Sequence, residues 1–533
     1  MTPVLQVDRL SIRAGTRRVV EDVSFTVAPG EALALVGESG SGKSATARAV
    51  IGLLPPGLRR DGGRVELLGE DLTAAPASRL MALRGPGIGM VFQEPMTSLN
   101  PALTVGAQME EGLALHTRMS RAERRDAMVA MLERVGIADP AHRLSAYPHE
   151  FSGGMRQRIM LASVMLLRPR LLIADEPTTA LDTLTQREVL DLMLSLARER
   201  GSSVLLITHD LGLVARYAGR AVVMQSGRVV EEGEAVPLLR APRQAYTRAL
   251  VDALPRRGPP RPPRLSDAPL IEARDLSVTY PGRGTLFRRA APNHAVDRVS
   301  LAVHPGEVVA LVGGSGSGKT TLGRAMLRLT PTAGGTLHFR GQDVTHRTGP
   351  ALLPFRLACG IVFQDPYSSL DPRMRVRDIV AEALRLPGDL PPRDRLRRAD
   401  TMLDEVGLSG LGGRFPHALS GGQRQRVAIA RALVRDPAFV VADEAVSALD
   451  ATVRKQVLTL LREEQRRRGF ACLFVTHDLA VVEEIADRIV VMQHGRIVEE
   501  GPRDTVLDAP SHDYTRALLD AAPRLPDRLE PVA

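Results

Sequence analysis

The sequence predicts an α/β fold that occurs twice in tandem, each copy built around a mostly parallel sheet. Two observations support this prediction: the chain repeats its own motifs in the same order, and continuous apolar runs alternate with helical stretches in both halves. Continuous apolar runs are typical of strands that are buried on both faces by helices. The 533 residues also exceed what one hydrophobic core usually organises, so two domains are expected.

The internal repeat determines the domain organisation. Gly37-Glu-Ser-Gly-Ser-Gly-Lys-Ser44 recurs as Gly313-Gly-Ser-Gly-Ser-Gly-Lys-Thr320, and Val91-Phe-Gln-Glu-Pro95 recurs as Val362-Phe-Gln-Asp-Pro366. From Pro148 onward matching residues keep one constant spacing, as in Ser152/Ser420, Asp175/Asp443, Asp182/Asp450, His209/His477 and Tyr246/Tyr514. We predict a first domain at residues 1–254 and a second at 270–533. Residues 255–269 between them are rich in proline and arginine, which indicates a semi-rigid, extended linker.

Both copies show the same order of elements. Short apolar strands at 31–36 and 308–312 run straight into the glycine-rich loops, and helices are expected from Ala45 and Thr321. Further buried strands are expected at 171–174, 204–207 and 221–224, matched by 439–442, 472–475 and 489–492. The matching order supports one fold for both copies.

The composition is that of a soluble globular protein, with 44% hydrophobic and 25% charged residues. No apolar run approaches the ~18 residues that suggest a membrane-spanning helix, and the first residues lack the layout of a secretory signal. Any membrane role is therefore expected to come through a partner protein. The two cysteines, Cys359 and Cys472, lie among apolar neighbours, which indicates buried thiols in a reducing compartment rather than a metal site.

The formal net charge of +9 suggests nucleic acid or an anionic surface as a partner. However, aromatic residues make up 3% of the chain and tryptophan is absent, so surfaces for stacking bases are scarce. Acidic residues also interrupt the basic stretches at 121–125 and 462–468. We interpret these stretches as solvated helix faces and expect no nucleic-acid partner, with nucleic-acid binding as the minor alternative.

The two glycine loops predict phosphate binding. A loop of the form G-x-x-x-x-G-K-[S/T] wraps backbone N–H groups around phosphates at a helix N-terminus. Lys43 and Lys319 would reach the β- and γ-phosphates, and Ser44 and Thr320 would ligate Mg²⁺. Of the 70 basic residues only Lys43, Lys319 and Lys455 are lysines, and a compact ammonium suits two of these positions better than a guanidinium. ATP and Mg²⁺ are the expected ligands.

A pair of acidic residues ends one apolar strand in each copy. Asp175 and Asp443 would hold Mg²⁺, while Glu176 and Glu444 would orient or deprotonate the attacking water. A capping Asp-Glu pair after a strand is common by itself. Here both copies place the pair at a similar distance behind the glycine loop, which favours the catalytic interpretation.

The complete motif set resembles the ABC transporter ATPases. The set comprises Gln93, Phe151-Ser-Gly-Gly-Met155, Asp175-Glu176, Ala180-Leu-Asp182 and His209, then Gln364, Leu419-Ser-Gly-Gly-Gln423, Asp443-Glu444, Ala448-Leu-Asp450 and His477. The resemblance implies two tandem P-loop ATPase domains, each with a RecA-like core, an antiparallel β subdomain and a helical subdomain, inserted around 95–165 in the first copy. It implies that His209 and His477 sense the γ-phosphate.

The same resemblance implies the ligand contacts. Nucleotide would be bound by Gly37, Glu38, Ser39, Gly40, Ser41, Gly42, Lys43, Ser44, Gln93, Ser152, Gly153, Gly154 and Asp182, and by Tyr280, Gly313, Gly314, Ser315, Gly316, Ser317, Gly318, Lys319, Thr320, Gln364, Ser420, Gly421, Gly422 and Asp450. Mg²⁺ would be held by Ser44, Gln93 and Asp175, and by Thr320, Gln364 and Asp443. The two domains would pair head to tail, so that the signature around Ser420 completes the Lys43 site and that around Ser152 completes the Lys319 site.

The segments that follow Gln93 and Gln364 are similar to those of the dipeptide/oligopeptide/nickel importer ATPases. So are the tails Ala245-Tyr-Thr-Arg-Ala-Leu250 and Asp513-Tyr-Thr-Arg-Ala-Leu518. This finer resemblance implies two fused ATPase subunits that drive two inner-membrane permeases from the cytoplasmic face, with a solute-binding protein delivering the substrate. Two departures stand out: Tyr280 is placed to stack on adenine but Ala14 occupies the matching position, and Ala445 replaces a usual proline. The alternatives are a tandem ATPase acting on ribosomes or nucleic acid, and a tandem sugar-importer ATPase.

Overall fold

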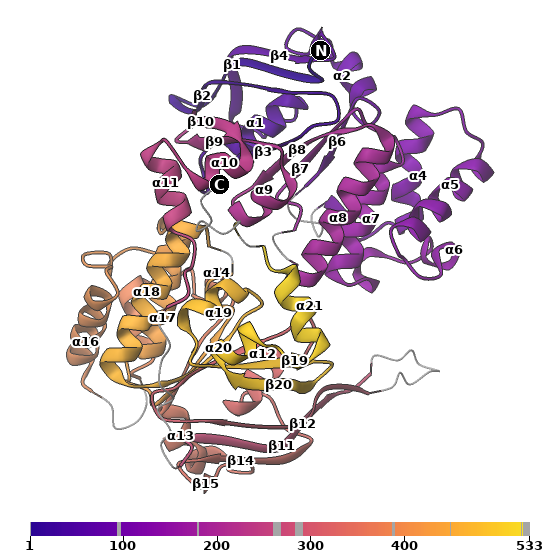
Figure 1. Ribbon diagram of the computed structural model, residues 1–533. Coiled ribbons are helices and arrows are strands. Elements are labelled where there is room, and N and C mark those ends of the chain that lie inside the picture. The colour runs from indigo at the N-terminus through magenta and orange to yellow at the C-terminus, as the bar shows by residue number, and fades with distance from the viewer. Residues whose placement is uncertain are drawn as a thin grey trace, which may run out of the picture. The chain divides into compact units, whose positions relative to one another are not determined.

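The computed structural model describes residues 2–92, 98–178, 181–258, 268–282, 292–385, 390–447, 449–523 and 525. Contacts divide the chain into two compact units, the first mainly Met1–Leu181 with Thr185–Ala253 and the second mainly Leu254–Ala522 (Figure 1). The boundaries expected at 254 and 270 stay a prediction, because most of the intervening stretch lies outside the described residues. The two units have the same architecture.

The described part of the first unit centres on a six-stranded sheet in the order β10-β9-β3-β8-β7-β6. Its strands are β3 (Ala32–Val36), β6 (Ile88–Val91), β7 (Leu171–Asp175), β8 (Ser203–Thr208), β9 (Arg220–Gln225) and β10 (Arg228–Glu234). All neighbours run parallel except β10, which is antiparallel to β9 at the edge. Along β8, Leu205 packs into one core cluster and Leu206 into another, because successive side chains point to opposite faces.

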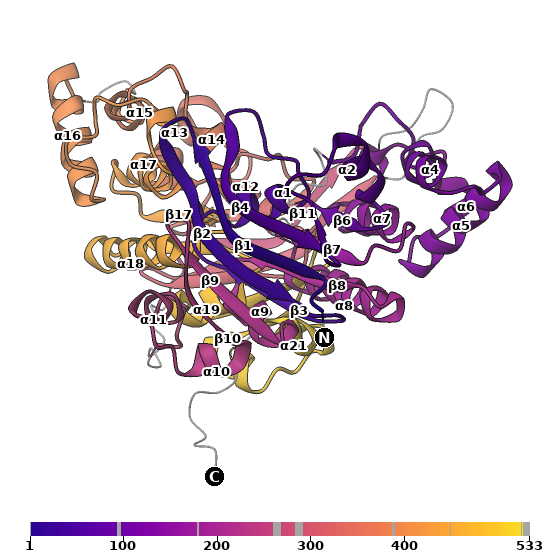
Figure 2. The ribbon, with the colours of Figure 1, turned by 90° about the horizontal axis from the view of Figure 1, so that it is seen from above.

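Two further layers flank this sheet. An antiparallel sheet, ordered β2-β1-β4-β5, contains β1 (Leu5–Ala14), β2 (Arg17–Val27), β4 (Leu58–Leu67) and β5 (Glu70–Asp71). The helices are α1 (Lys43–Val50), α2 (Ala77–Leu83), α4 (Val105–His116), α5 (Arg121–Arg134), α6 (Pro140–Arg143), α7 (Gly153–Met165), α8 (Thr183–Arg200), α9 (Leu211–Tyr217), α10 (Ala235–Arg240) and α11 (Ala245–Asp252). In Figure 2, β1, β2 and β4 form one layer, while α4, α5 and α6 gather at the opposite side of the unit from β9 and β10.

The second unit repeats this plan. Its described six-stranded sheet, ordered β16-β17-β18-β13-β19-β20, contains β13 (Val308–Val312), β16 (Cys359–Val362), β17 (Phe439–Asp443), β18 (Ala471–Val475), β19 (Arg488–Gln493) and β20 (Arg496–Pro502). The antiparallel sheet contains β11 (Ile271–Tyr280), β12 (Asn293–Val303), β14 (Gly334–Phe339) and β15 (Gln342–Asp343). The helices are α12 (Lys319–Met326), α13 (Leu353–Leu357), α14 (Pro366–Ser369), α15 (Val376–Glu382), α16 (Pro392–Glu405), α17 (Gly421–Leu433), α18 (Ala451–Arg468), α19 (Leu479–Ile485), α20 (Arg503–Asp508) and α21 (Asp513–Ala521).

The predicted α/β class is confirmed, and the strands lie where the apolar runs placed them. The helices expected from Ala45 and Thr321 were placed too late in the chain. They begin at Lys43 and Lys319, because Gly42 and Gly318 adopt left-handed φ angles of 102° and 103° and end the loops there.

The two cysteines differ in burial. Cys472 is 1% exposed inside β18, as expected, whereas Cys359 at the start of β16 is only partly buried. The expected burial is therefore complete for Cys472 and partial for Cys359, because the first residue of a strand lies at the rim of the core.

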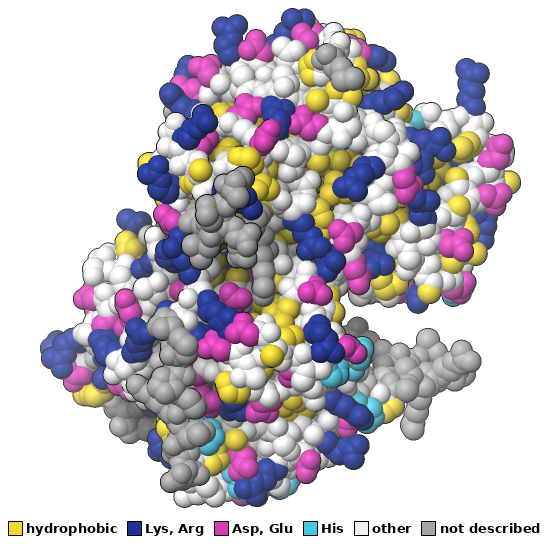
Figure 3. Space-filling view, viewed as in Figure 1, with side chains coloured by type: hydrophobic (Ala, Val, Ile, Leu, Met, Phe, Trp, Pro, Cys, Tyr) yellow, Lys and Arg dark blue, Asp and Glu magenta, His cyan; other side chains and the backbone are white. Residues whose placement is uncertain are grey.

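Charged side chains are mixed on the molecular face drawn in Figure 3, where Arg and Lys lie next to Asp and Glu over both units. Ion pairs join many of the described charged residues, such as Arg257 with Asp504 at 2.7 Å. Within the described residues, no helix is both long enough and apolar enough to cross a membrane.

Candidate nucleotide-binding and hydrolysis sites

The glycine loops join β3 to α1 and β13 to α12 in a shape that only glycine permits. Gly313 has a φ of 152°, and a Cβ atom there would lie 2.2 Å from the carbonyl oxygen of Met492. Gly37 has a φ of 151° and the same 2.2 Å approach to the carbonyl of Met224. The backbone must pass this close so that the loop can turn into the helix.

Each loop lysine folds back over its own loop. The Nζ of Lys43 donates hydrogen bonds to the carbonyl oxygens of Gly37 at 2.7 Å and Glu38 at 2.8 Å. The Nζ of Lys319 donates to Gly313 at 2.9 Å and Gly314 at 2.8 Å. Burial lowers the pKa of the Lys319 ammonium, although nearby carboxylates oppose this shift. Both ammonium groups are thus held at the mouth of a loop that suits phosphate.

A hydroxyl and a carboxylate meet beside each loop. Ser44 Oγ donates to Asp175 Oδ1 at 2.9 Å, and Thr320 Oγ1 donates to Asp443 Oδ1 at 2.8 Å. Both aspartates are 1% exposed, and burial raises the pKa of each carboxyl above its ordinary value, against the hydrogen bond from the hydroxyl. Such a buried carboxylate calls for a compensating positive charge.

The residues fit Mg²⁺. Asp443 Oδ2 is buried and has no hydrogen-bond partner among the described residues, and Arg324 lies 3.9 Å from it. Hydroxyl and carboxylate oxygens are the donors that this hard cation prefers. In the described part of the chain no cluster of three His, Cys, Asp or Glu side chains could hold a metal, so phosphate and water oxygens would supply the other ligands.

The strand-end glutamates occupy a strained backbone conformation. Glu176 and Glu444 have φ angles of 45° and 48°, which non-glycine residues adopt at a cost of order 1–3 kcal/mol. His209 Nδ1 lies 3.2 Å from Glu176 Oε1, and His477 Nδ1 lies 3.3 Å from Glu444 Oε1. Each glutamate thereby contacts the histidine that follows the neighbouring strand.

In the second unit a third predicted residue joins this pair. Gln364 Nε2 donates to Glu444 Oε2 at 2.8 Å. Burial alone would raise the pKa of Glu444 and lower that of His477, but their hydrogen bond and opposite charges outweigh it. The pKa of Glu444 is consequently lowered and that of His477 raised. The matching Gln93 lies outside the described residues.

The two signature segments begin helices α7 and α17. Ser152 Oγ accepts a hydrogen bond from the backbone N–H of Met155, and Ser420 Oγ accepts one from Gln423, both at 3.3 Å. Gly153 and Gly421, which directly follow these serines, are exposed, and no atom lies within 4 Å of a Cβ at Gly421. The N-terminus of each helix therefore presents its positive end next to an open glycine.

Gly154 and Gly422 have a packing role that the sequence did not reveal. A Cβ on Gly154 would lie 2.5 Å from Thr185 Cγ2 in α8, and one on Gly422 would lie 2.3 Å from Val453 Cγ1 in α18. These glycines allow two helices to approach closely. Their assignment as nucleotide contacts stays a prediction.

The remaining predicted residues lie at element ends. Asp450 caps α18 by accepting from the N–H of Val453 at 3.0 Å, and Asp182 directly precedes α8. Tyr280 ends β11 and is 41% exposed. The matching Ala14 ends β1. Adenine stacking on Tyr280 stays a prediction.

Two tyrosines contact the glycine loops, and the sequence analysis did not assign them to the site. Tyr246 in α11 accepts a hydrogen bond from the N–H of Glu38 at 3.1 Å, and Tyr514 in α21 accepts one from Gly314 at 2.7 Å. Their recurrence at matching positions in the two tails was the sequence signal that could have assigned them to the site. The C-terminal helix of each unit thus supports its phosphate loop.

Comparisons with known proteins agree with this geometry. The ABC transporter family model matches residues 20–179 and 296–447. The chain belongs to the ABC transporter ATP-binding proteins. A second model, the C-terminal region of oligopeptide/dipeptide transporters, matches residues 230–287 and 498–532. These two model matches confirm both levels of the resemblance seen in the motifs.

Two relatives match this ABC protein over nearly its full length. The peptidoglycan transport ATP-binding protein YejF of Agrobacterium fabrum is 46% identical over 98% of this chain and 96% of its own. The glutathione import ATP-binding protein GsiA of Escherichia coli is 44% identical over 95% of this chain and 86% of its own. The chain is the ATP-hydrolysing subunit of a peptide-type ABC importer, and it works with membrane permease partners.

Proposed function

We propose that this ABC ATPase has two complete hydrolytic sites and uses both to drive the import of a short peptide. One repeated arrangement supports this most directly. In each unit a hydroxyl donates a hydrogen bond to a buried aspartate, and a histidine contacts the adjacent glutamate. A degenerate site would be expected to lack one of these groups.

In each site the chain's own residues would act in sequence. The loop lysine and backbone N–H groups bind the phosphates of ATP. Ser44 with Asp175, and Thr320 with Asp443, would hold Mg²⁺, which would supply positive charge against the phosphates. The attacking water gives its proton to the glutamate carboxylate, which in the second unit is kept ionised by His477 and oriented by Gln364. His209 and His477 then report the γ-phosphate.

We infer that the two domains pair head to tail, as the motifs imply. The open N-termini of α7 and α17, each with an exposed serine and glycine, suit an anion supplied by the opposite domain. ATP would then join the domains, and hydrolysis would release them. This cycle gives the permeases two conformations to follow.

The partners would be two permease subunits in the inner membrane, which the chain approaches from the cytoplasmic face. A solute-binding protein would deliver the substrate to them. The full-length similarity to a glutathione import and a peptidoglycan transport protein favours a short peptide or a peptide conjugate as cargo.

The test is reconstitution of the chain with its cognate permeases in vesicles. ATP-dependent uptake should be seen for a labelled glutathione or cell-wall peptide and should stop with Lys43→Ala and with Lys319→Ala. Uptake that survives loss of either lysine would refute the two-site proposal. Transport of a sugar but of no peptide would refute the assigned cargo.

A further inference from the structure

A cavity of about 630 Å³ opens in the first unit, away from the phosphate loop, between α4, α5 and the segment that follows α7. Leu113, Met131 and Leu167 contribute apolar walls. The volume lies within the roughly 300–1,000 Å³ typical of small-molecule sites. None of the nucleotide-binding residues lines this cavity.

Three arginines, Arg134, Arg168 and Arg200, also line the cavity. Arg134 pairs with Glu199. In the described part of the chain, the guanidinium groups of Arg168 and Arg200 have no hydrogen bond or ion pair. Burial, followed by repulsion from Arg168 and Arg134, lowers the pKa of the Arg200 guanidinium. The rim of the cavity thus carries three arginines, of which Arg134 and Arg168 are exposed and Arg200 is partly buried, and among its lining residues none is acidic.

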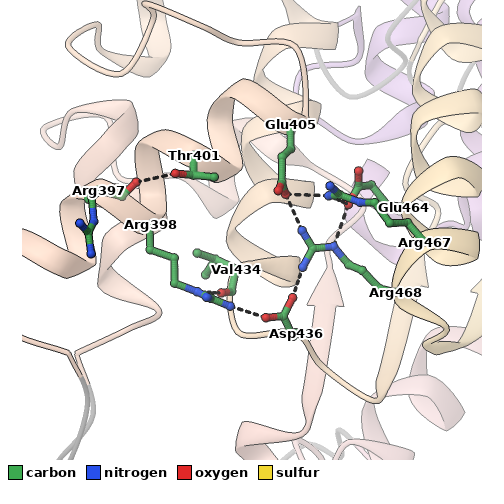
Figure 4. Close-up of polar contacts among 9 residues, drawn as sticks. All are labelled: Arg397, Arg398, Thr401, Glu405, Val434, Asp436, Glu464, Arg467 and Arg468. Atoms are coloured by element: carbon green, nitrogen blue, oxygen red, sulfur yellow. Dashed lines mark hydrogen bonds and ion pairs between the residues drawn. The ribbon is translucent and has the colours of Figure 1, made fainter.

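At the matching place in the second unit, carboxylates of the chain itself balance the positive charge of the arginines (Figure 4). Arg468, at the end of α18, corresponds to Arg200 at the end of α8. Its guanidinium forms ion pairs with Glu405, with Asp436 and, at 2.7 Å, with Glu464. Arg398 pairs with the same Asp436. Three carboxylates therefore surround a guanidinium that is 13% exposed.

The difference between the units lies in side chains and not in the backbone. Arg168 replaces Asp436, and the two have φ angles of 51° and 52° before a proline. Arg134 replaces Glu405 at the end of the equivalent helix, and Leu196 replaces Glu464. Two carboxylates have become arginines and the third has become apolar, while the central arginine is retained.

We propose that the cavity of the first unit binds an anionic ligand with an apolar body, whose carboxylate takes the place that Asp436 and Glu405 occupy in the second unit. The carboxylate pairs with Arg200 and Arg168, and the body lies against Leu113, Met131 and Leu167. A guanidinium that is partly removed from water gains most from such a charge-assisted, bidentate partner. The site is separate from ATP hydrolysis.

The probe is radiolabelled decanoate, which is added to the full chain below the concentration at which decanoate forms micelles. Binding is measured by equilibrium dialysis. We expect one saturable site per chain, and at least tenfold weaker competition from decan-1-ol, which has the same tail without the charge. Arg168→Asp should lower the affinity tenfold or more, because it supplies the internal carboxylate seen in the second unit. Arg200→Gln should lower it similarly by removing the central donor.

The matched control is Arg170→Asp, which makes the same charge change two residues away, at an exposed side chain outside the cavity. This variant should bind decanoate like the unmodified chain. Arg168→Asp should also unfold at an equal or higher temperature, since its new carboxylate pairs with Arg200. The proposal is overturned if no saturable binding occurs, if decan-1-ol competes as well as decanoate, or if Arg168→Asp and Arg170→Asp bind alike.

Discussion

The hydroxyl of Thr320 donates a 2.8 Å hydrogen bond to the buried carboxylate of Asp443, whose second oxygen has no hydrogen-bond partner among the described residues. Ser44 and Asp175 repeat the pair at 2.9 Å. In each unit the hydroxyl therefore points at the acid with which it would share Mg²⁺. This relationship leads to the first prediction.

Thr320→Val should lower ATPase activity by roughly tenfold or more and raise the Mg²⁺ concentration needed for half-maximal rate, because one oxygen ligand is lost. Thr320→Ser is the matched control and should stay near the unmodified rate, since serine serves at position 44. The measurement is ATPase rate against Mg²⁺ concentration. An unchanged Mg²⁺ dependence in the valine variant would remove Thr320 from the metal site.

Glu176→Gln and Glu444→Gln should each lower turnover of the permease-bound complex about tenfold or more, because general-base catalysis typically contributes 10²–10⁴-fold. ATP binding should persist, since the amide keeps the size of the side chain. Glu188→Gln, an exposed change on α8, is the control. The two-site proposal would be rejected if either single change left turnover intact.

Gly421→Ala and Gly422→Ala should behave differently. A Cβ at Gly421 meets no atom within 4 Å, so Gly421→Ala should fold normally and affect only ATPase rate. A Cβ at Gly422 would lie 2.3 Å from Val453, so Gly422→Ala should lose about 1–3 kcal/mol of unfolding free energy. Denaturant unfolding with parallel ATPase assays separates the effects. Equal stability of both variants would contradict the packing role.

Burial raises the pKa of both Cys359 and Cys472 to about 12. Because the thiolate is the reactive form, a raised pKa leaves roughly one part in 10⁴ reactive at pH 8, and reactivity should grow only as the pH rises toward 12. Iodoacetamide at pH 8 should label neither thiol in the folded chain and both in urea. If one thiol reacts slowly, it should be Cys359, which is the less buried. Rapid labelling of Cys472 would contradict its burial.

Tyr367→Glu should uncouple transport while nucleotide binding remains. Tyr367 lies in α14, just after Gln364, and is 65% exposed, with the Arg424 guanidinium 4.9 Å from its ring centre. We propose the segment Pro366–Met374 as a docking surface for the permease, so a charge there should weaken permease contact. Its counterpart Met96→Glu falls in Pro95–Leu103, where Pro95 and Met96 lie outside the described residues.

The measurement for Tyr367→Glu is co-purification with the permeases, alongside binding of a fluorescent ATP analogue. Tyr147→Glu, at a tyrosine that is 40% exposed, is the control and should co-purify normally. Undiminished recovery of the Tyr367→Glu chain with permease would exclude this segment from the docking surface.

The sequence by itself determined the α/β class, the duplication and the chemical groups of both sites. The glycine loops, the acids at strand ends and the histidines that follow strands are local patterns. Each can be recognised from the few residues around it in the chain. The parallel sheet then brings strand ends together, so that Glu444 and His477 could be expected to be neighbours.

Only the tertiary structure decided the contacts that depend on packing between distant elements. Val453 excludes a Cβ at Gly422, the Tyr514 hydroxyl meets the N–H of Gly314, and Arg468 gathers three carboxylates that Arg200 lacks. No local pattern encodes these contacts, because they arise where side chains far apart in the chain meet in a close-packed interior. The charge difference between the two units therefore depends on which side chains meet in space around Arg200 and Arg468.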